Sequence, residues 1–387
     1  MREGPARDRP ARRKQPPGRS GAKPDHGLPV YAAVDLGTNN CRLLIARQAS
    51  DTFRVIDAFS RTVRLGAGVK AHGTLSDRAM QRTIDALKIC ASKIKRRQAT
   101  HVRAIATEAC RLASNGEAFL QRVKSETDID LEIITPAEEA ELAAAGCAPL
   151  VDPACDVALV FDIGGGSTEL IWLDLTVATA PGEALPIAAW TSLPVGVVTL
   201  SERYRGKPNG PTTSTERAAA PGGFEDPAIF ERMVGEVRSL IRDFAGAEAF
   251  RPAFDRARAH LIGNSGTVTT LAGVHLDLDR YDRDRVDGAW LNLADLTALT
   301  ADLQAMGARG RARHPCIGAD RADLLVPGCA ILQAIQAEWP AKRVRVADRG
   351  LREGMLLDLM QRGRSSPVVP PPARLNAAEP APPRRRR

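Results

Sequence analysis

The chain has 387 residues, of which 44% are hydrophobic and 4% aromatic, so it is long enough for two domains with mainly aliphatic cores. Its net charge of +8 comes from the ends: residues 1–28 carry eight Lys or Arg against three acids, residues 363–387 carry six against one, and the region between them is about −2. The basic composition is therefore no argument for a nucleic-acid-binding fold, and no specific nucleic-acid partner is predicted.

Cysteine, histidine and apolar patterns exclude several classes of protein. The seven cysteines include no C-x-x-C pair and the six histidines no H-x-x-x-H pattern, so neither a disulfide framework nor a zinc site is predicted. No apolar run reaches the roughly 18–20 residues of a membrane span, and the N-terminus lacks the apolar segment of a secretory signal. We expect a cytoplasmic protein without a membrane partner. Both basic ends are predicted to be disordered, either solvated or in weak contact with a polyanion.

A short pattern occurs twice. Residues 34–45 are predicted to form a buried strand, a tight loop and a return strand, with Asp35 closing the first strand. Residues 161–172 repeat this pattern, with Asp162 in the same place. The amides of such a loop suit phosphate oxygens, and the Asp is placed to hold a divalent cation. One such turn alone is a common structural feature, whereas two copies indicate a duplicated half-domain with a phosphate clamp and a metal between the loops.

Helical spacing follows the first copy, with Met80, Ile84, Leu87, Ala91 and Ile94 on one face. A strand is predicted at 101–107, and Arg111 follows it, just before a helix start near Asn115. Two interpretations stay open for Arg111. It is either a surface arginine paired with an acid or a guanidinium fork that holds a phosphate oxygen.

Residues 135–141 have the pattern of a helix start. Thr135 is predicted as the N-cap, Pro136 suits the first helical position, and Glu138 completes a capping box by reaching back to the cap. Glu139 lies about 100° further round the helix and has no such task, so it is free to face a cleft. Any chemical role is therefore predicted for Glu139.

The rest of the chain alternates strands and helices. Strands are predicted at 157–163, 187–193, 260–262 and 343–346, helices at 229–241 and 320–338, and a flexible insertion at 205–227. Residues 263–273 combine a strand end, a Gly/Ser turn and a helix start. This is either a structural turn or an anion site at a helix N-terminus.

From about residue 30 to residue 361 the sequence resembles the exopolyphosphatase / guanosine pentaphosphate phosphohydrolase (Ppx/GppA) family. The stretches that carry the resemblance are the two loops, 107–115, 137–140, 192–196, 263–273, 321–323 and 348–354, in that order. It implies an α/β fold of two ribonuclease H-like domains with a cleft between them, as in the actin, sugar kinase and heat-shock chaperone ATPase superfamily. The expected divisions are a tail at 1–28, domains at 29–150 and 151–348, a last helix at 349–362 that packs on the first domain, and a tail at 363–387.

The resemblance also implies a homodimeric hydrolase that releases the terminal phosphate of polyphosphate or guanosine pentaphosphate. Glu139 would be the base that activates water, and Asp35 and Asp162 would hold Mg²⁺ or Mn²⁺. The residues implied in phosphate binding are Gly37, Thr38, Asn39, Arg42, Arg111, Gly164, Gly165, Gly166, Ser167, Ser265, Gly266 and Arg321.

Three departures from the family pattern leave alternatives open. Thr135-Pro136 stands where Ser-Gly is frequent, and Glu141 stands where an Arg is common, which removes a positive charge near the base. The chain also ends without the additional His-Asp phosphohydrolase-like domain of long members, which favours shorter chains or guanosine pentaphosphate as substrate. A catalytically weak sensor of guanosine polyphosphates and an ATP-dependent kinase or ATPase are the competing hypotheses. The retained Glu139 argues against the sensor, and the complete set of motifs argues against the kinase.

Overall fold

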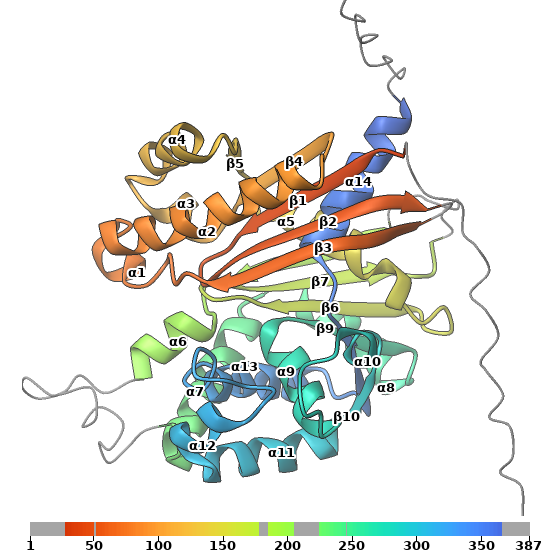
Figure 1. Ribbon diagram of the computed structural model, residues 1–387. Helices are drawn as coiled ribbons and strands as arrows, with labels where there is room; N and C mark the ends of the chain where they lie inside the picture. The colour runs from red at the N-terminus through yellow and green to blue at the C-terminus, as the bar shows by residue number, and fades with distance from the viewer. Residues whose placement is uncertain (1–27, 50–51, 178–184, 205–223, 245, 366–387) are drawn as a thin grey trace, which may run out of the picture.

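The computed structural model describes residues 28–49, 52–177, 185–204, 224–244 and 246–365. Residues 1–27 and 366–387 of the two predicted tails, and most of the predicted insertion at 205–227, lie outside these ranges. Residues 363–365, predicted as tail, instead belong to the last helix. The described chain consists of two halves, each built on its own β-sheet, and the two sheets face each other (Figure 1). None of the described helices combines the length and the apolar character that a membrane crossing requires.

The first sheet has five strands in the order β3-β2-β1-β4-β5. These are β1 (Val30–Leu36), β2 (Asn40–Ala49), β3 (Thr52–Thr62), β4 (His101–Ala106) and β5 (Leu131–Ile133). The first three pair antiparallel, whereas β4 runs parallel to β1 and β5 parallel to β4. The helices of this half are α1 (Val69–His72), α2 (Asp77–Arg96), α3 (Glu108–Leu112), α4 (Gly116–Thr127) and α5 (Pro136–Cys147). The predicted apolar face of α2 is confirmed, since Met80, Ile84 and Leu87 are buried in the core against the sheet.

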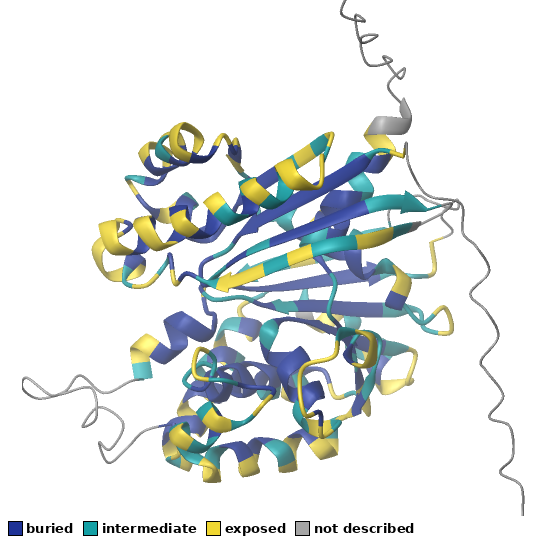
Figure 2. Cartoon of the chain, in the orientation of Figure 1, coloured by how far each residue is buried: buried dark blue, intermediate teal, exposed yellow. Residues whose placement is uncertain are grey.

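The second sheet has six strands in the order β10-β11-β9-β6-β7-β8. These are β6 (Val157–Ile163), β7 (Thr168–Asp174), β8 (Ile187–Leu193), β9 (Ala259–Asn264), β10 (Trp290–Asn292) and β11 (Arg343–Ala347). Its helices are α6 (Val197–Tyr204), α7 (Pro227–Arg242), α8 (Arg251–Asp255), α9 (Gly266–His275), α10 (Arg283–Val286), α11 (Leu293–Ala305), α12 (Gly307–Arg313) and α13 (Leu325–Glu338). The central strands of both sheets are buried, and the outer helices expose one face (Figure 2).

The two sheets repeat one topology. The strands β6, β7 and β8 pair antiparallel, and β9 and β11 continue the sheet in parallel, as β4 and β5 do in the first half. An antiparallel three-stranded unit followed by parallel strands, present twice, is the ribonuclease H-like arrangement of the actin-like superfamily. The fold class predicted from the sequence is confirmed.

One predicted helix begins later than expected. We predicted a helix at 320–338, whereas residues up to Leu324 form turns and α13 begins at Leu325. The reason is Pro327, which lacks an N–H and is tolerated in the first turn of a helix but not in its interior. A start at Asp320 would have placed this proline in the interior.

The last helix, α14 (Leu351–Ser365), returns from the second half to the first. Met355, Leu356 and Met360 pack into a core with Tyr31 and Leu44 of the first sheet. At the crossing of α14 with α5 the backbones touch: a Cβ on Gly146 would lie 1.9 Å from the carbonyl oxygen of the residue that precedes α14. The domain boundaries at residues 150 and 348 stay a prediction.

This crossing yields a first testable prediction. Gly146→Ala should destabilise the protein by about 1–3 kcal/mol, because backbone atoms on both sides must separate to admit the methyl group. The measurement is the midpoint of thermal unfolding. Gly235→Ala in α7 is the matched control, since nothing lies within 4 Å of its added Cβ. It should be neutral or stabilising, because Ala is the better helix former. Equal midpoints for both variants would contradict the close crossing.

Candidate active site

Two loops, one from each half, meet at a cavity of about 590 Å³. Each loop is closed by the same backbone hydrogen bond of 3.0 Å, from Gly37 to Asn40 in the first and from Gly164 to Ser167 in the second. Gly165 packs closely against the first loop, since an added Cβ would lie 3.1 Å from Cβ of Thr38. The duplicated hairpins therefore face each other across one cavity.

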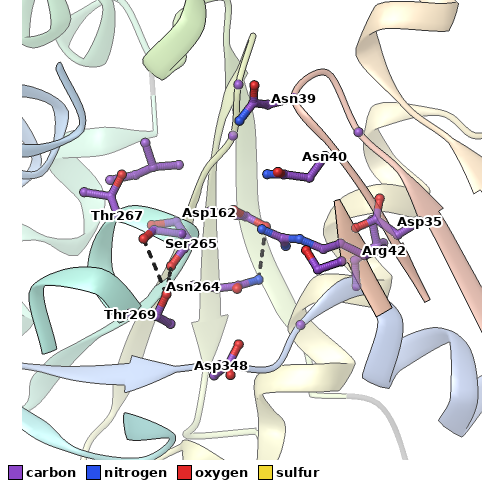
Figure 3. A pocket seen from close by; sticks show the side chains of 18 of the residues that line it. Asp35, Asn39, Asn40, Arg42, Asp162, Asn264, Ser265, Thr267, Thr269 and Asp348 are labelled. Atoms are coloured by element: carbon purple, nitrogen blue, oxygen red, sulfur yellow. Dashed lines mark hydrogen bonds between the residues drawn. The ribbon is translucent and has the colours of Figure 1, made fainter. Parts of the chain in front are cut away.

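Most residues predicted to form the site lie on the wall of this cavity. These are Asp35, Gly37, Thr38, Asn39, Arg42, Glu139, Asp162, Gly164, Gly165, Ser167, Ser265, Gly266 and Arg321. Asp35 and Arg42 enter from one side, and Asp162 and Ser265 enter from the other (Figure 3). Arg111 and Gly166 are not part of the wall.

Asp35 and Asp162 occupy matching positions of the two hairpins but have different neighbours. Asp35 pairs across its hairpin with Arg42, whereas Asp162 pairs with Glu169. Burial raises the pKa of Asp35, and Arg42 counteracts this effect. Burial and the Glu169 carboxylate raise the pKa of Asp162 to about 8. A cation beside Asp162 would lower this pKa and favour the charged carboxylate.

Positive charge gathers at the N-terminus of α9. A Cβ on Gly266 would lie 3.9 Å from Cζ of Arg321 and 4.0 Å from Nη2 of Arg42. Arg321 Nη1 donates a hydrogen bond of 2.9 Å to Thr270 Oγ1, which orients the guanidinium. Burial and then the neighbouring Arg42 lower the pKa of Arg321. Two guanidinium groups beside the first amides of a helix form a wall that favours anions.

The first turn of α5 differs in part from the prediction. Thr135 is the N-cap as predicted, and its Oγ1 accepts a hydrogen bond of 3.2 Å from the Glu138 N–H. The predicted return bond of a capping box is wrong, because the Glu138 carboxylate pairs with Arg103. Glu138 thus has a structural role, as expected, but it fulfils this role through the ion pair with Arg103 and not through a bond to the cap. Glu141 is exposed on the same helix and is not among the described residues that line the cavity.

Glu139 reaches the cavity with one oxygen lacking a hydrogen bond. Its Oε2 is buried without a hydrogen-bond partner among the described residues and lies 3.6 Å from Arg111 Nη1. Burial and then the Glu169 carboxylate raise the pKa of Glu139 well above its ordinary value. A buried carboxylate with a raised pKa on the wall of a cavity is suited to accept a proton in a reaction.

Arg111 lies behind Glu139. It belongs to α3 rather than to the end of a strand, and its Nη1 donates a hydrogen bond of 2.8 Å to the Ile134 carbonyl. The same nitrogen forms the ion pair with Glu139. Arg111 therefore orients the carboxylate, and its predicted contact with phosphate stays a prediction.

Comparison with known proteins agrees with this geometry. The model of the Ppx/GppA phosphatase family matches residues 44–363. The chain belongs to the Ppx/GppA phosphatase family. A family member from Aquifex aeolicus is 26% identical, with a TM-score of 0.69 over 88% of this chain and 100% of that one. An exopolyphosphatase from Cytophaga hutchinsonii is 26% identical, with a TM-score of 0.71 over 86% of this chain and 98% of that one. An exopolyphosphatase-like protein is 27% identical, with a TM-score of 0.72 over 87% of this chain and 98% of that one.

Sequence reasoning missed two residues of this phosphatase's cavity. Glu169 is buried there and accepts hydrogen bonds from Ser167 Oγ at 2.6 Å and Ser192 Oγ at 3.0 Å. Asn264 Nδ2 donates a hydrogen bond of 3.0 Å to Asp162 Oδ2. The register of the second hairpin could have revealed Glu169, which lies seven positions after Asp162, as Arg42 does after Asp35. Asn264 gives no such signal, since it lies 102 residues after Asp162 in the sequence, and only the pairing of β9 with β6 brings the two together.

The acidic part of the cavity suits a divalent cation that binds together with substrate. Within the described ranges, no three His, Cys, Asp or Glu side chains are grouped as a complete metal site. Mg²⁺ is usually held by one or two carboxylates, with waters and substrate phosphates as the other ligands. The Glu169 carboxylate raises the pKa of both Glu139 and Asp162, and Glu139 Oε2 lacks a hydrogen bond among the described residues. A cation beside these carboxylates would lower their raised pKa values, so the residues fit such a cation.

Proposed function

We propose that this phosphatase is an exopolyphosphatase, which releases orthophosphate from the end of inorganic polyphosphate. The observation that carries the proposal is Glu139, a buried carboxylate with a raised pKa on the wall of a cavity bordered by two phosphate-type loops. Water attacks the terminal phosphorus, a new P–O bond forms, and the bridging P–O bond of the anhydride breaks. Glu139 accepts the proton of the water, and the leaving phosphate chain takes the electron pair of the broken bond.

The charges around the cavity support this role. A polyanion repels a water nucleophile, so most of the catalytic effect must come from groups that neutralise the phosphates. Arg42, Arg321 and the amides of both loops provide donors for phosphate oxygens. Asp35 and Asp162, with Glu169, would hold Mg²⁺ or Mn²⁺, which would supply charge neutralisation at the transferred phosphoryl group. Arg111 keeps the Glu139 carboxylate in place through their ion pair.

Guanosine pentaphosphate is the second candidate substrate. Tyr281, Ile317 and Leu324 also line the cavity. A chain of phosphates has no apolar surface that could pack against such side chains. A purine base can pack against them, because stacking and apolar contact stabilise its binding. This wall favours a substrate with a base at the far end of its phosphates.

Phosphate release from defined substrates tests the proposal. Inorganic polyphosphate of several lengths, guanosine pentaphosphate and ATP are each incubated with the full chain, with and without Mg²⁺. Release from polyphosphate that depends on Mg²⁺ would support the proposal, and release from guanosine pentaphosphate alone would support the second candidate. Release from ATP alone, or none from any substrate, would contradict both. The homodimer stays a prediction, which sedimentation of the full chain tests.

A further inference from the structure

We propose that Lys70, which lies outside the cavity, is a positioning residue for the second phosphate loop. This inference rests on the proposed function, since it concerns how that loop is held for phosphate binding. Lys70 belongs to α1 in the first half, and the loop belongs to the second half. α1 and α6 lie side by side where the two halves meet (Figure 1), and the Gly68 N–H donates a hydrogen bond of 3.2 Å to Glu202 Oε1 of α6.

The ammonium group of Lys70 has three acceptors from three separate segments. Its Nζ donates hydrogen bonds of 2.9 Å to the carbonyls of Gly166 and Pro194, and lies 3.3 Å from Glu108 Oε1. A lysine ammonium has three N–H donors, which matches the two carbonyls and one carboxylate around it. Two of the acceptors lie in the second half, and one of these is the backbone of the phosphate loop itself.

The bond to Gly166 fixes a peptide plane of the loop. In a trans peptide the carbonyl of one residue and the N–H of the next point in opposite directions. Lys70 holds the Gly166 carbonyl on the side away from the cavity, so the Ser167 N–H points to the other side, where Ser167 borders the cavity. Lys70 thereby keeps one amide of the loop aimed at a phosphate oxygen.

Lys70 also neutralises a negative charge directly behind the loop. Glu108 is buried, and its Oε2 has no hydrogen-bond partner among the described residues. A Cβ on Gly166 would lie 1.9 Å from that oxygen, so only glycine allows the loop to approach it. Without Lys70 the buried carboxylate would lie unpaired against an anion site, which weakens anion binding and costs stability.

The test measures the affinity for inorganic tripolyphosphate by calorimetry. The parent protein for this test is the Glu139→Gln variant, which should bind the ligand without hydrolysing it. Adding Lys70→Met should weaken binding about tenfold, the effect expected for loss of a charged hydrogen-bonding group. The affinity of Lys70→Arg for tripolyphosphate should lie between those of the parent and Lys70→Met. Lys88→Met is the matched control, because Lys88 pairs with Glu126 at 2.8 Å on the surface of the same half, and it should bind like the parent. In the chain with Glu139 intact, Lys70→Met should raise KM about tenfold and change kcat by less than about threefold.

The outcomes separate this inference from the proposed function. Should Lys70→Met prevent folding, Lys70→Met with Glu108→Gln removes the unpaired carboxylate and should still bind several-fold more weakly than Glu108→Gln alone. The positioning role would be overturned, and the proposed function would stand, if Lys70→Met bound tripolyphosphate within twofold of the parent, or the double variant within twofold of Glu108→Gln. An equal loss of affinity in Lys88→Met would have the same meaning. Absence of tripolyphosphate binding in both the parent and the wild type would overturn the two together.

Discussion

Replacing Glu139 by Gln should slow phosphate release by about 10²–10⁴-fold, the usual contribution of a general base. Gln keeps the shape of the side chain but cannot accept the proton of the attacking water. Substrate binding should persist, because the arginines and loop amides that we propose to bind phosphates remain in place on the cavity wall. The measurements are kcat and KM for polyphosphate, together with the equilibrium affinity for tripolyphosphate. The expected result is a fall in kcat at nearly constant affinity.

Glu141→Gln is the matched control for this variant. It makes the same chemical change two residues along the same helix, at an exposed position that does not line the cavity. Its turnover should equal that of the wild type. Turnover of Glu139→Gln within a few-fold of the wild type would remove Glu139 from the role of base. An equal loss in Glu141→Gln would instead indicate that the charge of α5 as a whole is what matters.

Much of the fold followed from local patterns in the sequence. The two hairpins were predictable because an Asp, a glycine-containing loop and flanking apolar runs specify strand, turn and strand without reference to the rest of the chain. Repetition of this pattern indicated that two halves share a topology. The start of α5 was predictable for a similar reason, since Thr135 and Pro136 act within one turn of helix.

Long-range contacts were beyond local patterns. The Glu138 carboxylate pairs with Arg103 instead of its own cap, because a half-buried guanidinium is a stronger partner than a backbone N–H. The contact between Lys70 and the second loop joins residues 96 positions apart, and no periodicity indicates it. The sequence left open whether Arg111 faces an acid or a phosphate, and only the three-dimensional structure places its guanidinium beside Glu139.

The cavity carboxylates make stability depend on pH in a definite direction. Because burial and Glu169 raise the pKa of Asp162 from 3.8 to about 8, the folded state holds this proton more tightly than the unfolded state. Stability from this group is fully present below about pH 4 and is lost as the pH rises towards about 8. Each pKa unit is worth about 1.4 kcal/mol, so the cation-free protein should lose several kcal/mol over this range. A cation beside Asp162 reverses the loss, because it favours the charged form.

Asp162→Asn should therefore stabilise the cation-free protein at pH 8 and abolish most of its activity. The amide is neutral at every pH, and it can still accept the hydrogen bond that Asn264 donates to Asp162. The midpoint of thermal unfolding is measured between pH 5 and pH 8, with chelator and with Mg²⁺. The wild type should lose stability with rising pH in chelator and regain it with Mg²⁺, whereas the variant should show a shallower decline and a smaller gain. Asp243→Asn, exposed at the end of α7, should behave like the wild type. A variant that kept the full response to Mg²⁺ would place the cation elsewhere, since a neutral amide at this position could not supply the attraction that a carboxylate does.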